Sequence, residues 1–274
     1  MKSFQKKTVY ITGGSSGIGL AIAKALSAKG ANIVLFARDR ARLKTALNEV
    51  RTHQIRDLQR FGCLPLDVSD YQEVRRVMVA SVNANGVPDL LINCAGRSTP
   101  NYFDQIPFEQ FDEIVRVNLY GTWNTCSVLV PFMKERGSGQ IVNVSSVAGL
   151  IPIFGLSDYS ASKSAVVAFS RVLKRELKPY GIAVSVLVPT DTDTPGFQAE
   201  NKTKPIETKV ISSWSKVVSP DFIAQGLMKG LRKGKFVIIP TFLDRFFCFV
   251  YRLLPGLVDF TNDMDEKKAQ KNKS

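Results

Sequence analysis

Residues that hold metals or form disulfides are scarce in this 274-residue chain. It has four cysteines and one histidine. The cysteines are scattered without a Cys-x-x-Cys pair, and His53 lies in a polar stretch. This pattern excludes a disulfide-rich secreted scaffold and predicts reduced thiols and no metal site. A Ser-His-Asp triad is also disfavoured, because no nucleophile motif lies near His53.

Long apolar runs are missing as well. No run of roughly eighteen uninterrupted apolar residues occurs, which excludes a polytopic membrane protein. The polar first seven residues and the short apolar run 8–11 are unlike a signal peptide, so we expect a cytoplasmic protein. With 45% hydrophobic residues, the chain has enough apolar material for an ordinary core.

Negative charge is in the minority. There are 24 acidic against 37 basic residues, which gives a net charge of +13. Such a balance fits a nucleic acid, an anionic membrane, a phosphorylated ligand or a merely basic surface. The sequence contains no recognised helix-turn-helix or aromatic RNA-binding motif, so we expect no nucleic-acid partner.

Short apolar runs rich in β-branched residues alternate with helical patterns. Runs that are apolar on both faces are typical of a parallel sheet covered by helices. The alternation predicts an α/β fold with one Rossmann-like, doubly wound parallel sheet of about seven strands and helices on both faces. Strands are expected at 8–12, 32–37, 63–66, 90–94, 140–144, 182–188 and 236–239, and helices at 17–29, 40–59, 70–85, 108–135, 158–178 and 220–232. A capping box at 69–72 and an N-cap at Ser219, before Pro220, support two helix starts.

Two segments break the alternation. Residues 189–218 form a connection long enough to be a lid or binding loop. Residues 241–274 follow the last expected strand. We therefore assign 1–240 to one dinucleotide-binding domain that includes the loop 189–218. We assign 241–274 to an apolar helix with a basic tail.

A glycine-rich turn follows the first expected strand. Gly13, Gly17 and Gly19 are spaced Gly-x-x-x-Gly-x-Gly and lead into a helix. Such a turn lets the backbone approach a pyrophosphate, and the helix directs its positive end at the phosphates. The candidate phosphate-binding residues of this loop are Gly13, Ser15, Ser16, Gly17, Ile18 and Gly19.

The end of the second expected strand carries positive charge. Enzymes that use NAD usually place a carboxylate at this position, where it binds the ribose. Arg38 stands here instead, with Arg42 one helical turn further on. Two guanidinium groups suit a 2′-phosphate and predict NADPH. Asp39 is the counter-argument, because it could bind the ribose of NADH.

A serine, a tyrosine and a lysine form the candidate catalytic set. Tyr159 and Lys163 are spaced i, i+4 and so share a helix face. Ketone reduction needs a proton for oxygen, and Lys163 together with an oxidised cofactor is expected to lower the pKa of Tyr159. A serine hydroxyl would hold the substrate carbonyl. Ser145 and Ser146 are adjacent and are expected to point to opposite sides of a strand.

These motifs, in this order, resemble the short-chain dehydrogenase/reductase superfamily over about residues 7–240. The resemblance implies Ser146 rather than Ser145 as the carbonyl-binding serine, with Tyr159 as proton donor and Lys163 as its partner. It implies that Asn118 holds a water in the proton relay. Cofactor contacts are implied for Asp67, Val68, Asn93, Ala95, Gly96, Tyr159, Lys163, Pro189, Thr192 and Thr194. Cys94 departs from the usual Asn-Asn-Ala-Gly form of this motif.

The segment from Pro189 to Thr208 is similar to that of 3-ketodihydrosphingosine reductases. This resemblance implies NADPH-dependent reduction of 3-ketodihydrosphingosine to dihydrosphingosine (sphinganine) in sphingolipid biosynthesis. Alternatives are another lipophilic ketone, such as a steroid or 3-ketoacyl group, and a non-catalytic cofactor-binding scaffold. Asp191 or Asp193 could meet the substrate ammonium, or both could only form turns in a polar loop.

The C-terminal segment is aromatic and apolar. On a helix, Phe242, Phe246, Phe249 and Leu253 form a stripe, and the polar strip that contains Asp244, Cys248 and Arg252 lies opposite. The wide apolar face suits a helix lying in a membrane interface, here at a cytosolic face (the endoplasmic reticulum in a eukaryote). Lysines at 267, 268, 271 and 273 could meet anionic headgroups. The alternatives are a helix that covers the substrate pocket or a contact in a homo-oligomer.

Overall fold

Seven parallel strands form one sheet in this computed structural model, which describes residues 3–271. Residues 1–2 and 272–274, with Lys273 of the expected basic tail, lie outside the described range. The sheet order is β3-β2-β1-β4-β5-β6-β7, so the order reverses between β1 and β4. The strands are β1 (Thr8–Thr12), β2 (Asn32–Ala37), β3 (Phe61–Pro65), β4 (Leu90–Asn93), β5 (Gly139–Val144), β6 (Ile182–Leu187) and β7 (Val237–Ile238). The predicted doubly wound fold is confirmed.

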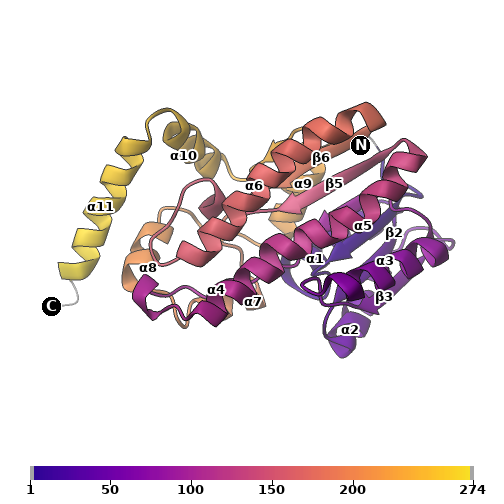
Figure 1. Cartoon of the computed structure of the whole chain (residues 1–274), viewed down its shortest axis with the longest axis horizontal. Helices are drawn as coiled ribbons and strands as arrows, with labels where there is room; N and C mark the ends of the chain where they lie inside the picture. Colours follow the sequence, from indigo (N-terminus) through magenta and orange to yellow (C-terminus); the bar gives the residue numbers. More distant parts are fainter. Residues whose placement is uncertain (1–2, 272–274) are drawn as a thin grey trace.

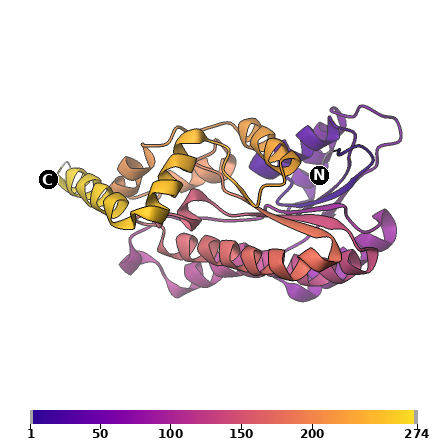
Figure 2. The same ribbon diagram turned by 90° about the horizontal axis from the view of Figure 1, so that it is seen from above.

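Helices cover both faces of the sheet (Figures 1 and 2). Alternate residues of β1 face opposite cores: Val9 and Ile11 belong to one, and Tyr10 to the other. The first core includes residues of α1 (Gly17–Ser27), α2 (Arg40–Arg51) and α9 (Pro220–Arg232). The second includes residues of α3 (Tyr71–Asn85), α5 (Gly121–Arg136) and α6 (Ser157–Leu177). Burial on both faces explains why the strands are almost continuously apolar.

Several expected boundaries differ from the structure. The helix expected at 40–59 ends at Arg51, and the segment at 108–135 is divided into α4 (Phe108–Val115), a π-helical turn (Arg116–Tyr120) and α5. Asp70, not Ser69, caps α3, because its carboxylate accepts the N–H groups of Gln72 and Glu73. The N-cap at Ser219 is confirmed, since its hydroxyl accepts the N–H of Phe222.

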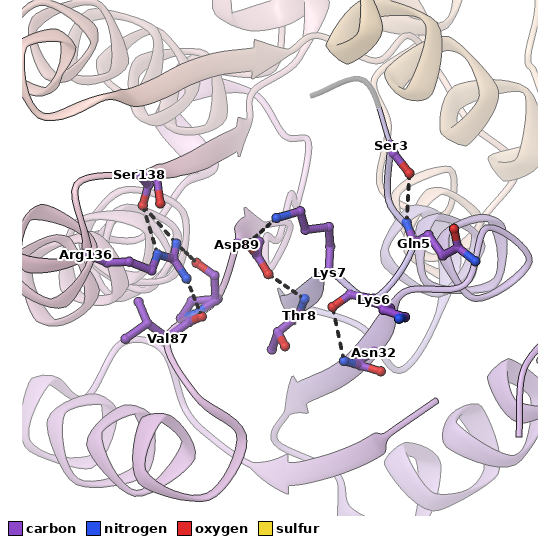
Figure 3. A network of polar contacts seen from close by, with 11 residues as sticks. Ser3, Gln5, Lys6, Lys7, Thr8, Asn32, Val87, Asp89, Arg136 and Ser138 are labelled. Atoms are coloured by element: carbon purple, nitrogen blue, oxygen red, sulfur yellow. Dashed lines mark hydrogen bonds and ion pairs between the residues drawn. The ribbon is translucent and has the colours of Figure 1, made fainter. Parts of the chain in front are cut away.

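The amino-terminal edge of the sheet is closed by a polar network (Figure 3). Asp89, before β4, accepts the backbone N–H of Thr8 at 2.9 Å and the ammonium of Lys7 at 3.0 Å. Arg136, at the end of α5, donates to the carbonyls of Val87 and Ser138. These contacts hold the starts of β1, β4 and β5 together and leave the opposite, carboxyl edge for the functional site.

The segment 189–218 is not a plain loop. It contains α7 (Pro195–Glu200) and α8 (Ile206–Ser212). Beyond β7, α10 (Phe242–Leu253) ends before Pro255, as the apolar pattern predicts. A further helix, α11 (Pro255–Lys271), follows directly and was missed because Pro255 and Gly256 were interpreted as a stop. Helix α11 packs against α8 and α10 packs against α11, at the end of the molecule far from β2 and β3 (Figure 1). None of the described helices has the length and apolar content to cross a bilayer.

Candidate active site

One large cavity, of about 780 Å³, opens at the carboxyl edge of the sheet. The glycine loop forms one end of it: Gly13, Ser15, Ser16, Gly17, Ile18 and Gly19 all line the wall. Helix α1 begins here, and its N-cap residue Ser16 makes no side-chain capping bond to the first-turn N–H groups. An uncapped helix N-terminus that faces a cavity fits a pyrophosphate.

The glycines of this loop are needed for close backbone contacts. A Cβ atom at Gly19 would lie 2.2 Å from the carbonyl oxygen of Gly13. At Gly13, where φ is +67°, a Cβ would lie 2.7 Å from the backbone nitrogen of Ala95. Side chains at either position would therefore force the loop away from α1 and from the end of β4.

The two arginines expected near a 2′-phosphate are placed differently. Arg38, which follows β2, lines the cavity. Arg42 is not among the lining residues, and its guanidinium lies 3.5 Å from Asp39. Asp39 in turn caps α2 by accepting the N–H groups of Ala41 and Arg42. The carboxylate that could have bound the ribose of NADH is thus engaged in the helix start.

Most other expected cofactor residues line the same cavity. They are Asp67, Val68, Ala95, Gly96, Tyr159, Lys163, Pro189, Thr192 and Thr194. Asn93 is the exception, because its buried amide donates to Asn143 and accepts from Thr125. It joins β4, β5 and α5, and it supports the cavity floor without lining it.

The expected catalytic side chains converge in the middle of the cavity. The hydroxyl of Ser146 hydrogen-bonds with that of Tyr159. Lys163 donates to the carbonyl of Val144 at 3.0 Å, and its ammonium lies 5.7 Å from the centre of the Tyr159 ring. Ser145 points away and donates to the carbonyl of Lys163, 2.9 Å distant. The choice of Ser146 over Ser145 therefore fits the geometry.

Burial controls the electrostatics of this cluster. It raises the pKa of Tyr159, and the nearby carboxylates of Glu200 and Asp191 act in the same direction. Desolvation outweighs the hydrogen bond from Ser146. The lowering expected from the sequence was for Lys163 acting together with an oxidised cofactor, and it stays a prediction. Burial also lowers the pKa of Lys163 to about 8.

Asn118 lies in the π-helical turn between α4 and α5. Its side chain accepts the N–H of Arg97 at 2.8 Å, and donates to the carbonyl of Arg97 and to the hydroxyl of Ser162. Its carbonyl accepts the hydroxyl of Thr122. The π turn directs Asn118 at the strand connection after β4 and at α6, where its side chain makes three hydrogen bonds.

Comparison with known proteins agrees with this geometry. A short chain dehydrogenase family model matches residues 7–205. The chain belongs to the short-chain dehydrogenase family. It is 43% identical to the 3-dehydrosphinganine reductase of Danio rerio over 83% of this chain and 69% of that protein. It is 36% identical to the 3-ketodihydrosphingosine reductase of Dictyostelium discoideum over 93% of this chain and 79% of that protein.

Solved structures share the fold of this dehydrogenase. A short-chain dehydrogenase/reductase from Burkholderia phymatum, solved in complex with NAD, superposes with a TM-score of 0.82 and 24% identity over 94% of this chain and 96% of that chain. The apo form of LigD from Sphingobium sp. strain SYK-6 gives a TM-score of 0.78 with 27% identity over 94% of this chain and 98% of that chain. Membership of the family indicates a nicotinamide dinucleotide cofactor.

The opposite end of the dehydrogenase cavity is built by residues that sequence reasoning did not assign. Trp214 follows α8, and Phe247, Val258 and Thr261 come from α10 and α11. Trp214 packs edge-on against Phe247 and donates to Asp265 of α11 at 2.6 Å. No local motif marks these residues. The only signal in the sequence was the aromatic C-terminal segment, for which one alternative was a helix that covers the substrate pocket.

The two aspartates considered for substrate binding differ in position. Asp191 lines the cavity but pairs with Lys204, whose ammonium lies 3.2 Å from its carboxylate. Asp193 is exposed, accepts from Gln198 and is not among the lining residues. Glu200, at the end of α7, also lines the cavity and was not considered from the sequence.

Proposed function

We propose that this short-chain dehydrogenase reduces 3-ketodihydrosphingosine to dihydrosphingosine with NADPH, as a step of sphingolipid biosynthesis. One observation carries the proposal. The cavity that holds the glycine loop also holds Ser146, Tyr159 and Lys163, in a chain whose relatives at 36–43% identity are named for this reaction. The Trp214, Phe247 and Val258 side chains at the other end suit an aliphatic chain.

The chemistry needs a hydride at carbon and a proton at oxygen. Bound NADPH supplies the hydride. Tyr159 donates its phenolic proton to the carbonyl oxygen, and its raised pKa keeps that proton in place at neutral pH. Ser146, which already hydrogen-bonds with Tyr159, donates to the same oxygen and so orients the carbonyl and stabilises its developing charge.

Lys163 and Asn118 support the proton donor. Lys163 is held by the Val144 carbonyl, and its ammonium favours the tyrosinate formed when the proton leaves. With a pKa of about 8, Lys163 can also pass a proton back to Tyr159 near neutral pH. Asn118 stays the proposed holder of a relay water. The side-chain oxygen accepts the N–H of Arg97 and the backbone carbonyl accepts the hydroxyl of Thr122, so the proposed water would bind a remaining lone pair of one of these two oxygens.

The preference for NADPH is assigned to Arg38. It is exposed, lines the cavity and follows β2, where the 2′-position of the adenine ribose lies in this fold. The engagement of Asp39 in capping α2 supports the same choice. Arg42 contributes through its charge alone, since it pairs with Asp39.

A membrane surface is the proposed place of action. Residues 242–264 expose an apolar set that we name the C-terminal apolar surface, made of Phe242, Phe246, Phe249, Leu253, Leu254, Leu257, Phe260 and Met264. The opposite side of α10 packs inward, with Asp244 buried and Phe247 in the cavity wall. The same helices thus line the cavity and present apolar side chains outward, as a lipid substrate entering from the cytosolic face of a membrane requires. A homo-oligomer contact through this surface is the competing arrangement.

The assay that tests the function follows NADPH consumption by purified protein with three ketones: 3-ketodihydrosphingosine, a steroid ketone and a 3-ketoacyl thioester. We expect kcat/KM to be at least about tenfold higher for 3-ketodihydrosphingosine, since its ammonium and chain both find matching groups. Preference for either other ketone would overturn the proposed substrate, and absence of turnover with all three would favour a cofactor-binding scaffold.

A further inference from the structure

The charged side chains that line the cavity from the segment between β6 and α8 do not balance. Asp191, Glu200 and Lys204 come from the segment between β6 and α8, and all three line the cavity. Lys204 is almost fully buried and lies 3.2 Å from Asp191, with its ammonium over the ring of Phe197. Its one positive charge is therefore committed to Asp191. Among the described residues, no cation lies within ion-pair distance of Glu200.

Glu200 lines the same cavity as the reacting groups Tyr159 and Lys163. Its charge raises the pKa of both residues. Burial is the main cause that raises the pKa of Glu200 to about 7, with Lys204 and Lys163 opposing and Asp191 adding to the shift. A partly buried carboxylate without a paired cation is unfavourable in the free protein and is stabilised when a cation arrives.

We propose that Glu200, rather than Asp191 or Asp193, binds the 2-ammonium group of the substrate and so selects 2-amino-3-ketones over plain ketones. The ammonium stands on the carbon next to the carbonyl, so its partner must line the cavity that holds Tyr159, as Glu200 does. When the substrate is bound, its ammonium and that of Lys204 equal in number the carboxylates of Asp191 and Glu200. This inference rests on the proposed function and assigns the substrate preference to a single residue, Glu200.

The test compares Glu200→Gln with wild type on 3-ketodihydrosphingosine and on a des-amino ketone of the same chain length. Asp193→Asn, in the same segment but outside the cavity, is the matched control. We expect Glu200→Gln to lower kcat/KM for the amino ketone by roughly 10- to 100-fold, the range of one charge-assisted hydrogen bond. The des-amino ketone should change by less than about threefold, and Asp193→Asn should leave both unchanged.

The pH dependence gives a second readout. The groups that face Glu200 are Lys204 and Asp191 from its own segment and Lys163 and Tyr159 from α6. Glu200 is neutral below about pH 7 and charged above it, so the preference for the amino ketone should rise as pH increases through 7. Glu200→Gln should abolish this rise, and Glu200→Asp should retain part of it.

The outcomes separate the two proposals. Equal losses on both ketones, or an unchanged preference, would overturn the role of Glu200 and leave the reductase function standing. No turnover of the amino ketone by wild type, with turnover of the des-amino ketone, would overturn both. Thermal denaturation of each variant shows whether a loss comes from misfolding.

Discussion

The two ends of the active-site cavity are built by different kinds of structure. At the cofactor end, the wall is the set of turns at the carboxyl ends of β1 to β5, where backbone segments touch. At the substrate end, the wall is made of side chains from α7, α8, α10, α11 and the turns beside them. In α10 only Asp244 is buried, whereas six residues of α1 are. The geometry of the sheet therefore fixes the cofactor end, whereas the side chains of the substrate end can change without disturbing the core.

The largest effect is expected where the two ends meet. Tyr159→Phe removes the proposed proton donor and should lower kcat by roughly 10²- to 10⁴-fold, the usual contribution of a positioned general acid. NADPH affinity, measured by fluorescence titration, should change little, because the glycine loop is untouched. Tyr180→Phe, at an exposed position outside the cavity, is the control. Residual turnover above about a tenth of wild type would contradict the role of Tyr159.

Paired glycine substitutions compare the rigidity of the two ends. Gly19→Ala places a Cβ 2.2 Å from the Gly13 carbonyl oxygen, so we expect a loss of about 3 kcal/mol in unfolding free energy and much weaker NADPH binding. Gly256→Ala, near the start of α11, has no heavy atom within 4 Å and should be neutral or slightly stabilising. Chemical denaturation measures both. Similar destabilisation by the two substitutions would remove the contrast between the ends.

The same contrast explains what could be predicted from sequence. The glycine loop, Arg38, Ser146, Tyr159 and Lys163 lie at strand ends or on one helix face, so a local pattern and the parallel topology together place them. The roles of individual side chains were harder to predict. The amide of Asn93 points into the protein interior, and Arg42 pairs with Asp39, the residue that caps α2. Both placements depend on side-chain rotamers and on neighbouring residues, which a local sequence pattern does not specify.

The substrate end could be predicted least. Trp214 meets Phe247 and Asp265 only because α10 and α11 pack against the segment after α8, far away in sequence, and no spacing rule encodes those contacts. The effect of burial on the pKa of Tyr159 could not be predicted either, since desolvation depends on the finished fold.

At the cofactor end, charge reversal at Arg38 sharpens the assignment of NADPH. Arg38→Asp should raise KM for NADPH by roughly 10- to 100-fold and lower KM for NADH, because a carboxylate repels a 2′-phosphate and accepts from a 2′-hydroxyl. Arg42→Ala should change KM for NADPH by less than about threefold, since this exposed side chain pairs with Asp39. A larger effect at Arg42 than at Arg38 would reverse the assignment.

The smallest effect is expected at the outer face of the substrate end. Phe246 and Phe249 of α10 are 52% and 60% exposed, so replacing both with serine should hardly change the thermal midpoint. Binding to vesicles with anionic lipid, measured by flotation, should fall by about tenfold or more, because two aromatic side chains no longer enter the interface. Serine at Ile55 and Leu58, which are also exposed but lie between α2 and the start of β3, outside α10 and the cavity, is the matched control and should leave flotation unchanged. The contrary outcome is that both double variants float like wild type and that the Phe246/Phe249 variant changes the oligomeric state measured by sedimentation. The C-terminal apolar surface would then be a contact between copies of this chain instead of a membrane contact.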